Sequence, residues 1–69
     1  FEIESYDISL LKSLSKGLTL EDIGSEFKVS GIHPNSNSSI EKRINRLKIY
    51  FKASNNVHLI AITKDLGLV

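Results

Sequence analysis

The 69-residue sequence contains no cysteine, so neither a disulfide framework nor a thiolate metal site can stabilise it. No apolar run approaches the roughly 20 residues that a membrane-spanning helix needs, and the chain does not open with a basic segment followed by an apolar one. We therefore expect a cytoplasmic protein with no membrane partner. Low-complexity tracts are also missing and 41% of the residues are hydrophobic, which predicts a single folded domain over residues 1–69.

The residue types used in catalysis are present, but not at catalytic spacings. The two histidines, His33 and His58, are far apart in sequence, which favours surface or structural roles. There is no Gly-rich phosphate loop and no pairing of a nucleophile with a base. Asp22 and Glu26 stand one helical turn apart, but so short a chain encloses no large pocket around them. We expect no enzymatic activity, no cofactor and no metal site.

The charges are unevenly distributed, although the net charge is only +1. Residues 1–27 carry six acids and two lysines, whereas residues 28–69 carry seven cations and two acids. Five of those seven cations lie between Lys42 and Lys52. Such a segment indicates an anionic partner that is contacted by one element, although a solvated helix face gives the same pattern.

Hydrophobic spacing and end signals predict four helices and no sheet. The first helix covers residues 5–16, begins near Ser5 or Asp7 and stops at Gly17, because glycine adopts the left-handed conformation at little cost. Its apolar stripe consists of Tyr6, Leu10, Leu11 and Leu14.

The second helix, residues 20–27, has the best-marked start. Thr19 and Asp22 have the spacing of a capping box, and Leu18 and Ile23 that of a hydrophobic staple. Gly24 lies in the centre, where glycine costs about 1 kcal/mol relative to alanine. It indicates either a close helix crossing or a tolerated weak point. A polar turn over residues 28–35, which contains the only proline, is expected to follow.

The third predicted helix covers residues 36–51. Its N-cap is Ser36 or, in a capping box with Glu41, Ser38. Its apolar stripe has spacings of four, three and four, and consists of Ile40, Ile44, Leu47 and Phe51. The opposite face is polar and basic, with Ser38, Lys42, Asn45 and Ile49 in its centre, Glu41, Lys48 and Lys52 along one edge and Arg46 along the other.

A fourth helix, capped by Asn55 or Asn56, is expected to reach residue 66 and to end at Gly67. One apolar stripe consists of Leu59, Ile62 and Leu66, while Val57, Ile60 and Ala61 leave apolar surface on another side. The second side indicates a contact outside this domain, or it is the apolar surface that a helix of a small core leaves exposed.

A short capped helix, a turn and a longer helix with a basic outer face form the arrangement that places a helix in the major groove of double-stranded DNA. Asn45 can pair with adenine, Lys42 with guanine and Glu41 with cytosine. Cations and helix-start hydroxyls can meet phosphates. The sequence therefore predicts DNA binding, and the alternative is a protein-interaction module without significant DNA affinity. The predicted phosphate-facing residues are Thr19, Ser36, Ser38, Ser39, Arg46, Lys48 and Lys52.

The residues 17–24, GLTLEDIG, and 36–44, SNSSIEKRI, resemble the LuxR-type (NarL/FixJ-type) helix-turn-helix domain. The pattern of that family is G-L-S/T-x-x-E/D-I-A, a short turn and S-x-x-T-V-x-x-H/R, and its final capped helix is similar to residues 55–61. The sequence departs from the pattern at Gly24, which replaces alanine, at Ser39-Ile40, which replaces Thr-Val, and in a longer turn. Residues 3–7 also differ from the usual L-T-x-R-E start.

The resemblance implies that Glu41, Lys42 and Asn45 face bases, while Ser39, Arg46 and Lys48 lie near phosphates. It also implies a homodimer through the last helix, with Val57, His58, Ala61 and Asp65 in the interface. Such domains follow a receiver or sensor domain, and a start at Phe1 instead of methionine fits the C-terminal part of a longer regulator. We therefore expect an all-α, four-helix effector domain of a two-component response regulator that controls transcription.

Overall fold

The computed structural model describes residues 2–69, so Phe1 lies outside the described part. It contains the helices α1 (Ser5–Ser15), α2 (Leu20–Ser30), α3 (Asn37–Phe51) and α4 (Asn56–Asp65), and no strand occurs in residues 2–69. The predicted all-α, four-helix class is therefore confirmed. Within these residues no helix combines the length and the apolar character needed to cross a membrane.

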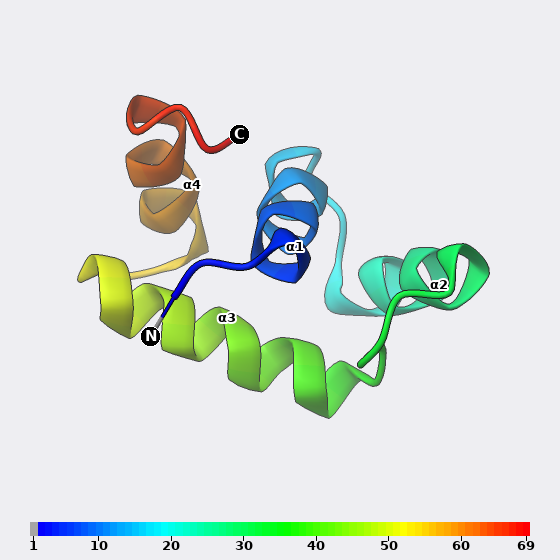
Figure 1. Ribbon diagram of the computed structural model, residues 1–69. Coiled ribbons are helices and arrows are strands. Elements are labelled where there is room, and N and C mark those ends of the chain that lie inside the picture. Colours follow the sequence, from blue (N-terminus) through cyan, green and yellow to red (C-terminus); the bar gives the residue numbers. More distant parts are fainter. Residues whose placement is uncertain (1) are drawn as a thin grey trace.

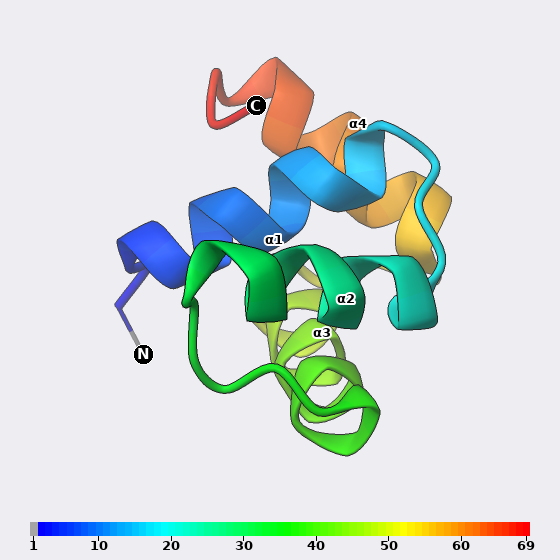
Figure 2. The same ribbon diagram turned by 90° about the vertical axis from the view of Figure 1, so that its right-hand side faces the viewer.

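The longest helix, α3, lies along one side of the molecule (Figure 1). Contacts link α3 to α2 and to α4, and α1 packs on α2 and α4. In Figure 2, where α2 faces the viewer, α1 lies above α2 and α3 lies below it, and the turn descends from the end of α2 to the start of α3. The face of α3 that points away from the other helices is thus left open.

One hydrophobic core draws side chains from all four helices. The stripe predicted for α3 is confirmed, because Ile40, Ile44 and Leu47 are buried and Phe51 is partly buried against the same core. Each fully buried apolar side chain contributes roughly 1.5–3 kcal/mol, so this stripe holds α3 firmly to the domain. The core consists of Leu10, Leu11, Ile23, Phe27, Ile40, Ile44, Leu47 and Leu59.

Side-chain caps set the starts of α1 and α2. The capping box at α2 is confirmed, since the Thr19 hydroxyl accepts the Asp22 N–H at 3.2 Å and the Asp22 carboxylate accepts the Thr19 N–H at 3.3 Å. At α1 the cap is Glu4, which the sequence analysis did not propose. The predicted start near Ser5 is correct, and Asp7 is the partner of the cap, because its carboxylate accepts the Glu4 N–H at 2.9 Å.

Caps also settle the two alternatives left open for α3 and α4. Ser36, and not Ser38, caps α3, because its hydroxyl accepts the Ser39 N–H at 3.2 Å. Asn55 caps α4, and its side-chain oxygen accepts the His58 N–H at 2.9 Å.

The helix α2 is longer than predicted, and the turn after it is shorter. Residues 28–30 were assigned to the turn, but they continue the helix as far as Ser30. Gly31 then ends it in the left-handed conformation, with φ at 72°, and the Ile32 N–H donates to the Phe27 carbonyl at 2.8 Å. The predicted end at Phe27 was wrong because the helix is stopped by the glycine and not by the polar residues before it.

The buried side of α4 also differs from the prediction, since Ile60, which was placed on the other side, packs against the core. Leu66 was expected in the apolar stripe, but it follows the last helical residue and is 60% exposed. Thr63 is fully buried instead, one helical turn after Leu59. Its hydroxyl donates to the Leu59 carbonyl at 3.0 Å, which satisfies its polar atom inside the helix and allows its burial.

Candidate nucleic-acid interface

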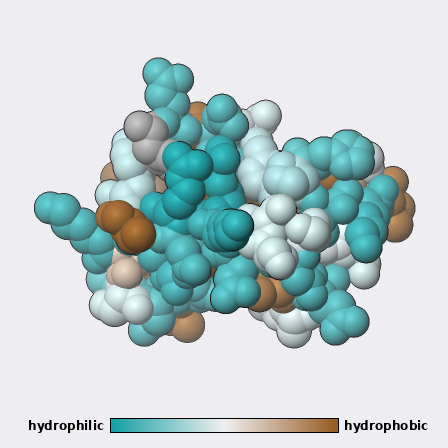
Figure 3. Space-filling model, turned by 90° about the horizontal axis from the view of Figure 1, so that it is seen from below, coloured by the Kyte–Doolittle hydropathy of each residue, from teal (hydrophilic) through white to brown (hydrophobic). Residues whose placement is uncertain are grey.

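The outer face of α3 is open to solvent. Figure 3 views the side of the molecule on which α3 lies, and its surface there is mainly hydrophilic with scattered hydrophobic groups. The three predicted base-facing residues, Glu41, Lys42 and Asn45, are all exposed. Their donors and acceptors are therefore accessible on the side opposite the buried stripe, while contact with bases stays a prediction.

An apolar residue also lies on this face. Ile49 is 78% exposed and stands one helical turn beyond Asn45. The sequence pattern predicted this outward position, but no role for the side chain. On a DNA-facing helix such a side chain has a partner, because apolar groups contact the methyl group of thymine.

The hydroxyl groups at the start of α3 form a small cluster. The Ser36 hydroxyl donates to Ser39 Oγ at 2.9 Å in addition to accepting the Ser39 N–H. Ser38 is exposed beside them, and Ser39 is half-buried. This helix start has the backbone and hydroxyl donors that suit an anion.

Thr19 lies apart from this cluster, at the start of α2. Both its hydroxyl and its backbone N–H are paired with Asp22, so a carboxylate already occupies the position that a phosphate would take. The structure thus gives Thr19 a capping role, and its predicted phosphate contact stays untested.

Three further cations of the basic segment surround the outer face. Arg46 and Lys52 are exposed and Lys48 is half-buried. Lys52 ends α3 in the left-handed conformation, with φ at 57°, which is the one positive φ among the non-glycine residues of the described chain. A lysine there is strained, since side chains other than glycine rarely adopt this conformation.

The fifth cation, Arg43, points to α1 instead of to the outer face. Its Nε donates to Asp7 Oδ1, and its Nη2 donates to Asp7 Oδ2 and to Glu4 Oε2, both at 3.0 Å. Asp7 is fully buried, and the Arg43 side chain is 22% exposed. The hydrogen bond to Asp7 raises the pKa of Arg43 above its usual value, so the guanidinium stays charged.

Tyr6 connects the same region to the turn. Its hydroxyl donates to the Pro34 carbonyl at 2.9 Å, and the Arg43 guanidinium lies 5.5 Å from the centre of its ring. Burial raises the pKa of Tyr6, the negative charge of Asp7 adds to this shift, and the positive charge of Arg43 opposes it.

The turn passes directly over α2 at Gly24. A Cβ atom on Gly24 would lie 3.0 Å from the Asn35 carbonyl oxygen and 3.3 Å from Asn37 Oδ1. A close approach therefore exists at Gly24, but its nearest backbone belongs to the turn, with the first residue of α3 beside it, and not to the crossing helix that was expected. The turn is further fixed by the Asn35 side chain, whose Nδ2 donates to the Ile32 carbonyl at 3.0 Å.

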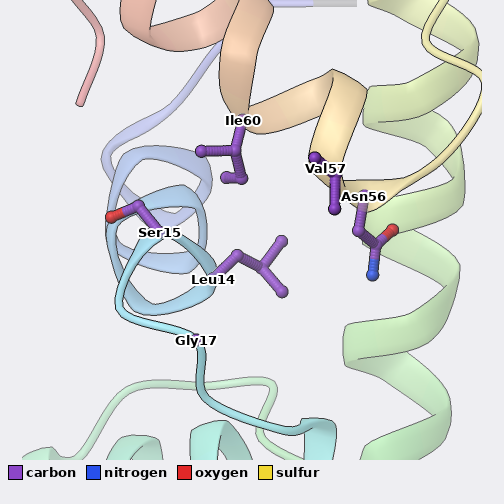
Figure 4. Close-up of a pocket in the computed structure, with 6 residues that line it drawn as sticks. All are labelled: Leu14, Ser15, Gly17, Asn56, Val57 and Ile60. Atoms are coloured by element: carbon purple, nitrogen blue, oxygen red, sulfur yellow. The ribbon is translucent and has the colours of Figure 1, made fainter.

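The predicted dimer residues lie on α4. Val57, His58, Ala61 and Asp65 are all exposed, and their spacing places them on one side of the helix. Val57 is 81% exposed and borders a hollow of about 210 Å³ between the end of α1 and the start of α4. Leu14 and Ile60 also point into this mostly apolar hollow (Figure 4).

The ion pair of Asp7 and Arg43 was missed by the sequence analysis. The two residues are 36 positions apart, and no periodicity links them. The sequence did contain one indication of this pair. Asp7 follows Tyr6 on the inward side of the first helix, and a buried acid needs a cationic partner.

The chain was compared with protein-family models, with curated proteins and with solved structures. No protein-family model, no curated protein and no solved structure matches the chain.

Proposed function

We propose that the protein binds double-stranded DNA through a helix-turn-helix formed by α2 and α3, and regulates transcription. The observation that carries the proposal is the two-sided character of α3, whose apolar stripe is buried while its opposite face exposes Glu41, Lys42 and Asn45. With its side chains an α-helix is about 10–12 Å across, which matches the major groove of about 12 Å.

Electrostatic attraction supports this placement. Four cations, Lys42, Arg46, Lys48 and Lys52, remain on or next to the outer part of α3 once Arg43 is paired with Asp7. Each phosphate contact lowers the slope of log K against log salt by about 0.9, so contacts from the three predicted phosphate-facing cations, Arg46, Lys48 and Lys52, give a slope of about −3. Base contacts add selectivity, each worth about 1–3 kcal/mol.

Fluorescence anisotropy with duplex DNA at several salt concentrations tests the proposal. We expect salt-dependent binding by the wild type. In the double variant Lys42→Ala/Arg46→Ala we expect weaker binding, with a salt slope reduced by about one through the lost Arg46 contact. The matched control is Lys12→Ala/Lys64→Ala, which removes the same charge from exposed positions on α1 and α4. Absence of binding at low salt would refute the proposal and favour a protein-interaction module.

The proposal extends to the resemblance with LuxR-type domains. In that role the protein is cytoplasmic, acts as the effector part of a response regulator, and dimerises on DNA through the exposed side of α4. A two-fold dimer presents two α3 helices to half-sites about 34 Å apart. Sedimentation with a DNA of two half-sites tests this part, since a strict monomer with and without DNA would contradict it.

A further inference from the structure

We infer that Asp7 is a positioning residue for DNA binding, which it supports by holding α3 at a fixed angle through Arg43, while the neighbouring Tyr6 holds the turn. We call these three residues the α1–α3 anchor. The inference rests on the proposed function, because the angle matters only if α3 enters a groove. It adds a requirement that the proposal does not contain, namely that a buried acid promotes the binding of a polyanion.

The backbone of α1 makes fewer close contacts with α3 than with α2 and α4. Arg43 adds a direct link between α1 and α3, through two parallel hydrogen bonds to one carboxylate. The planar fork of a guanidinium fixes orientation as well as distance, so this pair restrains rotation of α3 about its own axis.

The anchor is attached at three points. The Asp7 carboxylate is itself held in place, because its Oδ2 accepts the Glu4 N–H at 2.9 Å. The neighbouring Tyr6 donates to the Pro34 carbonyl of the turn that leads into α3. Two adjacent residues of α1 therefore hold the flank of α3 and the segment before its first turn.

Removal of the Asp7 charge has opposite expected effects through electrostatics and through positioning. Asp7 is fully buried and cannot contact DNA. Its replacement by asparagine removes a negative charge and breaks one of the two ion pairs of Arg43, and on electrostatic grounds alone both changes would strengthen binding to DNA. A loss of affinity in Asp7→Asn can therefore come only from altered placement of α3, provided that the variant is folded.

The experiment compares the DNA affinities of Asp7→Asn and Glu4→Gln by fluorescence anisotropy on the same duplex. Circular dichroism and thermal unfolding select a temperature at which both variants are folded. Glu4→Gln is the matched control, because it removes the same charge from a residue that also contacts Arg43. Glu4 is 66% exposed, and the hydrogen bonds between Asp7 and Arg43 remain in this variant. We expect Asp7→Asn to bind at least about tenfold more weakly, the equivalent of one lost base contact, with an unchanged salt slope. We expect Glu4→Gln to bind as the wild type or slightly tighter.

Unchanged or tighter binding by folded Asp7→Asn would overturn the inference. If that variant does not fold, Arg43→Lys replaces it, since it keeps the charge and loses the fork. Weaker binding of Arg43→Lys with an unchanged salt slope supports positioning, and an unchanged affinity overturns it.

A second measurement separates the anchor from DNA binding itself. If the wild type does not bind DNA, the proposed function fails, and amide hydrogen exchange still tests the anchor. We then expect Asp7→Asn to speed exchange at the Ile40 amide, which donates to the Ser36 carbonyl at 3.0 Å, more than at the Leu59 amide of α4. Equal changes at the two amides would contradict a role of the anchor in placing α3.

Discussion

Replacing Gly24 by alanine tests whether the turn presses on α2. On an open helix surface this substitution stabilises a protein by about 1 kcal/mol. At Gly24 the added Cβ would lie 3.0 Å from the Asn35 carbonyl oxygen and 3.3 Å from Asn37 Oδ1, both closer than ordinary van der Waals contacts. The Asn37 side chain can rotate away. The Asn35 carbonyl belongs to the backbone, so the turn must move.

The turn is held at two points, which makes that movement costly. The Asn35 side chain donates to the Ile32 carbonyl, and Tyr6 donates to the Pro34 carbonyl. Overpacking of this kind costs about 1–3 kcal/mol. The gain in helix propensity offsets part of this cost, so we expect the free energy of unfolding to fall by about 1 kcal/mol. A loss of this size lowers the Tm of a domain of this length by roughly 4–8 °C.

Thermal unfolding followed by far-UV circular dichroism measures this difference. Ser25→Ala is the matched control, because Ser25 is the next residue of α2 and is exposed. We expect a small rise in its Tm, since alanine is the better helix former. A rise in the Tm of Gly24→Ala, as on an open helix surface, would refute the close approach of the turn.

Two further predictions concern strain and pH. Lys52→Gly relieves the strain of the left-handed φ of 57° at the end of α3. We therefore expect the free energy of unfolding to rise by about 1 kcal/mol, with a higher Tm, and the DNA salt slope to fall by about one. An unchanged Tm would count against the strain. Burial raises the pKa of Tyr6 above its ordinary value of 10.0, so its contribution to stability is complete below pH 10 and is lost as the pH rises through the raised pKa. Tyr6→Phe should therefore flatten the fall of Tm above pH 10, and equal slopes for variant and wild type would show that Tyr6 is not responsible.

Local signals in the sequence predicted most of the fold. The start of α2 follows from Thr19 and Asp22, and the buried side of α3 from its apolar spacing, because both depend on residues within a few positions of one another. The end of α2 was misplaced since several polar residues precede Gly31, and only the glycine stops the helix.

Contacts between distant segments could not be predicted in this way. The pair of Asp7 and Arg43 joins two helices with no shared pattern, so Arg43 was counted with the basic segment. Gly24 and the long turn were two separate departures from the LuxR-type pattern, which itself stays a prediction. The structure places them in contact, because the Asn35 carbonyl lies over Gly24, and a single steric cause accounts for the glycine.

The capture of Arg43 by α1 divides α3 into two sets of positions. Ile40, Arg43, Ile44 and Leu47 belong to the scaffold, whereas Glu41, Lys42, Asn45 and Ile49 contribute little to the core. Substitutions at exposed positions usually change stability by less than about 0.5 kcal/mol. In the proposed role, substitutions at the exposed positions can therefore change the preferred DNA sequence while the fold is kept. A new recognition surface designed on this scaffold must keep Arg43.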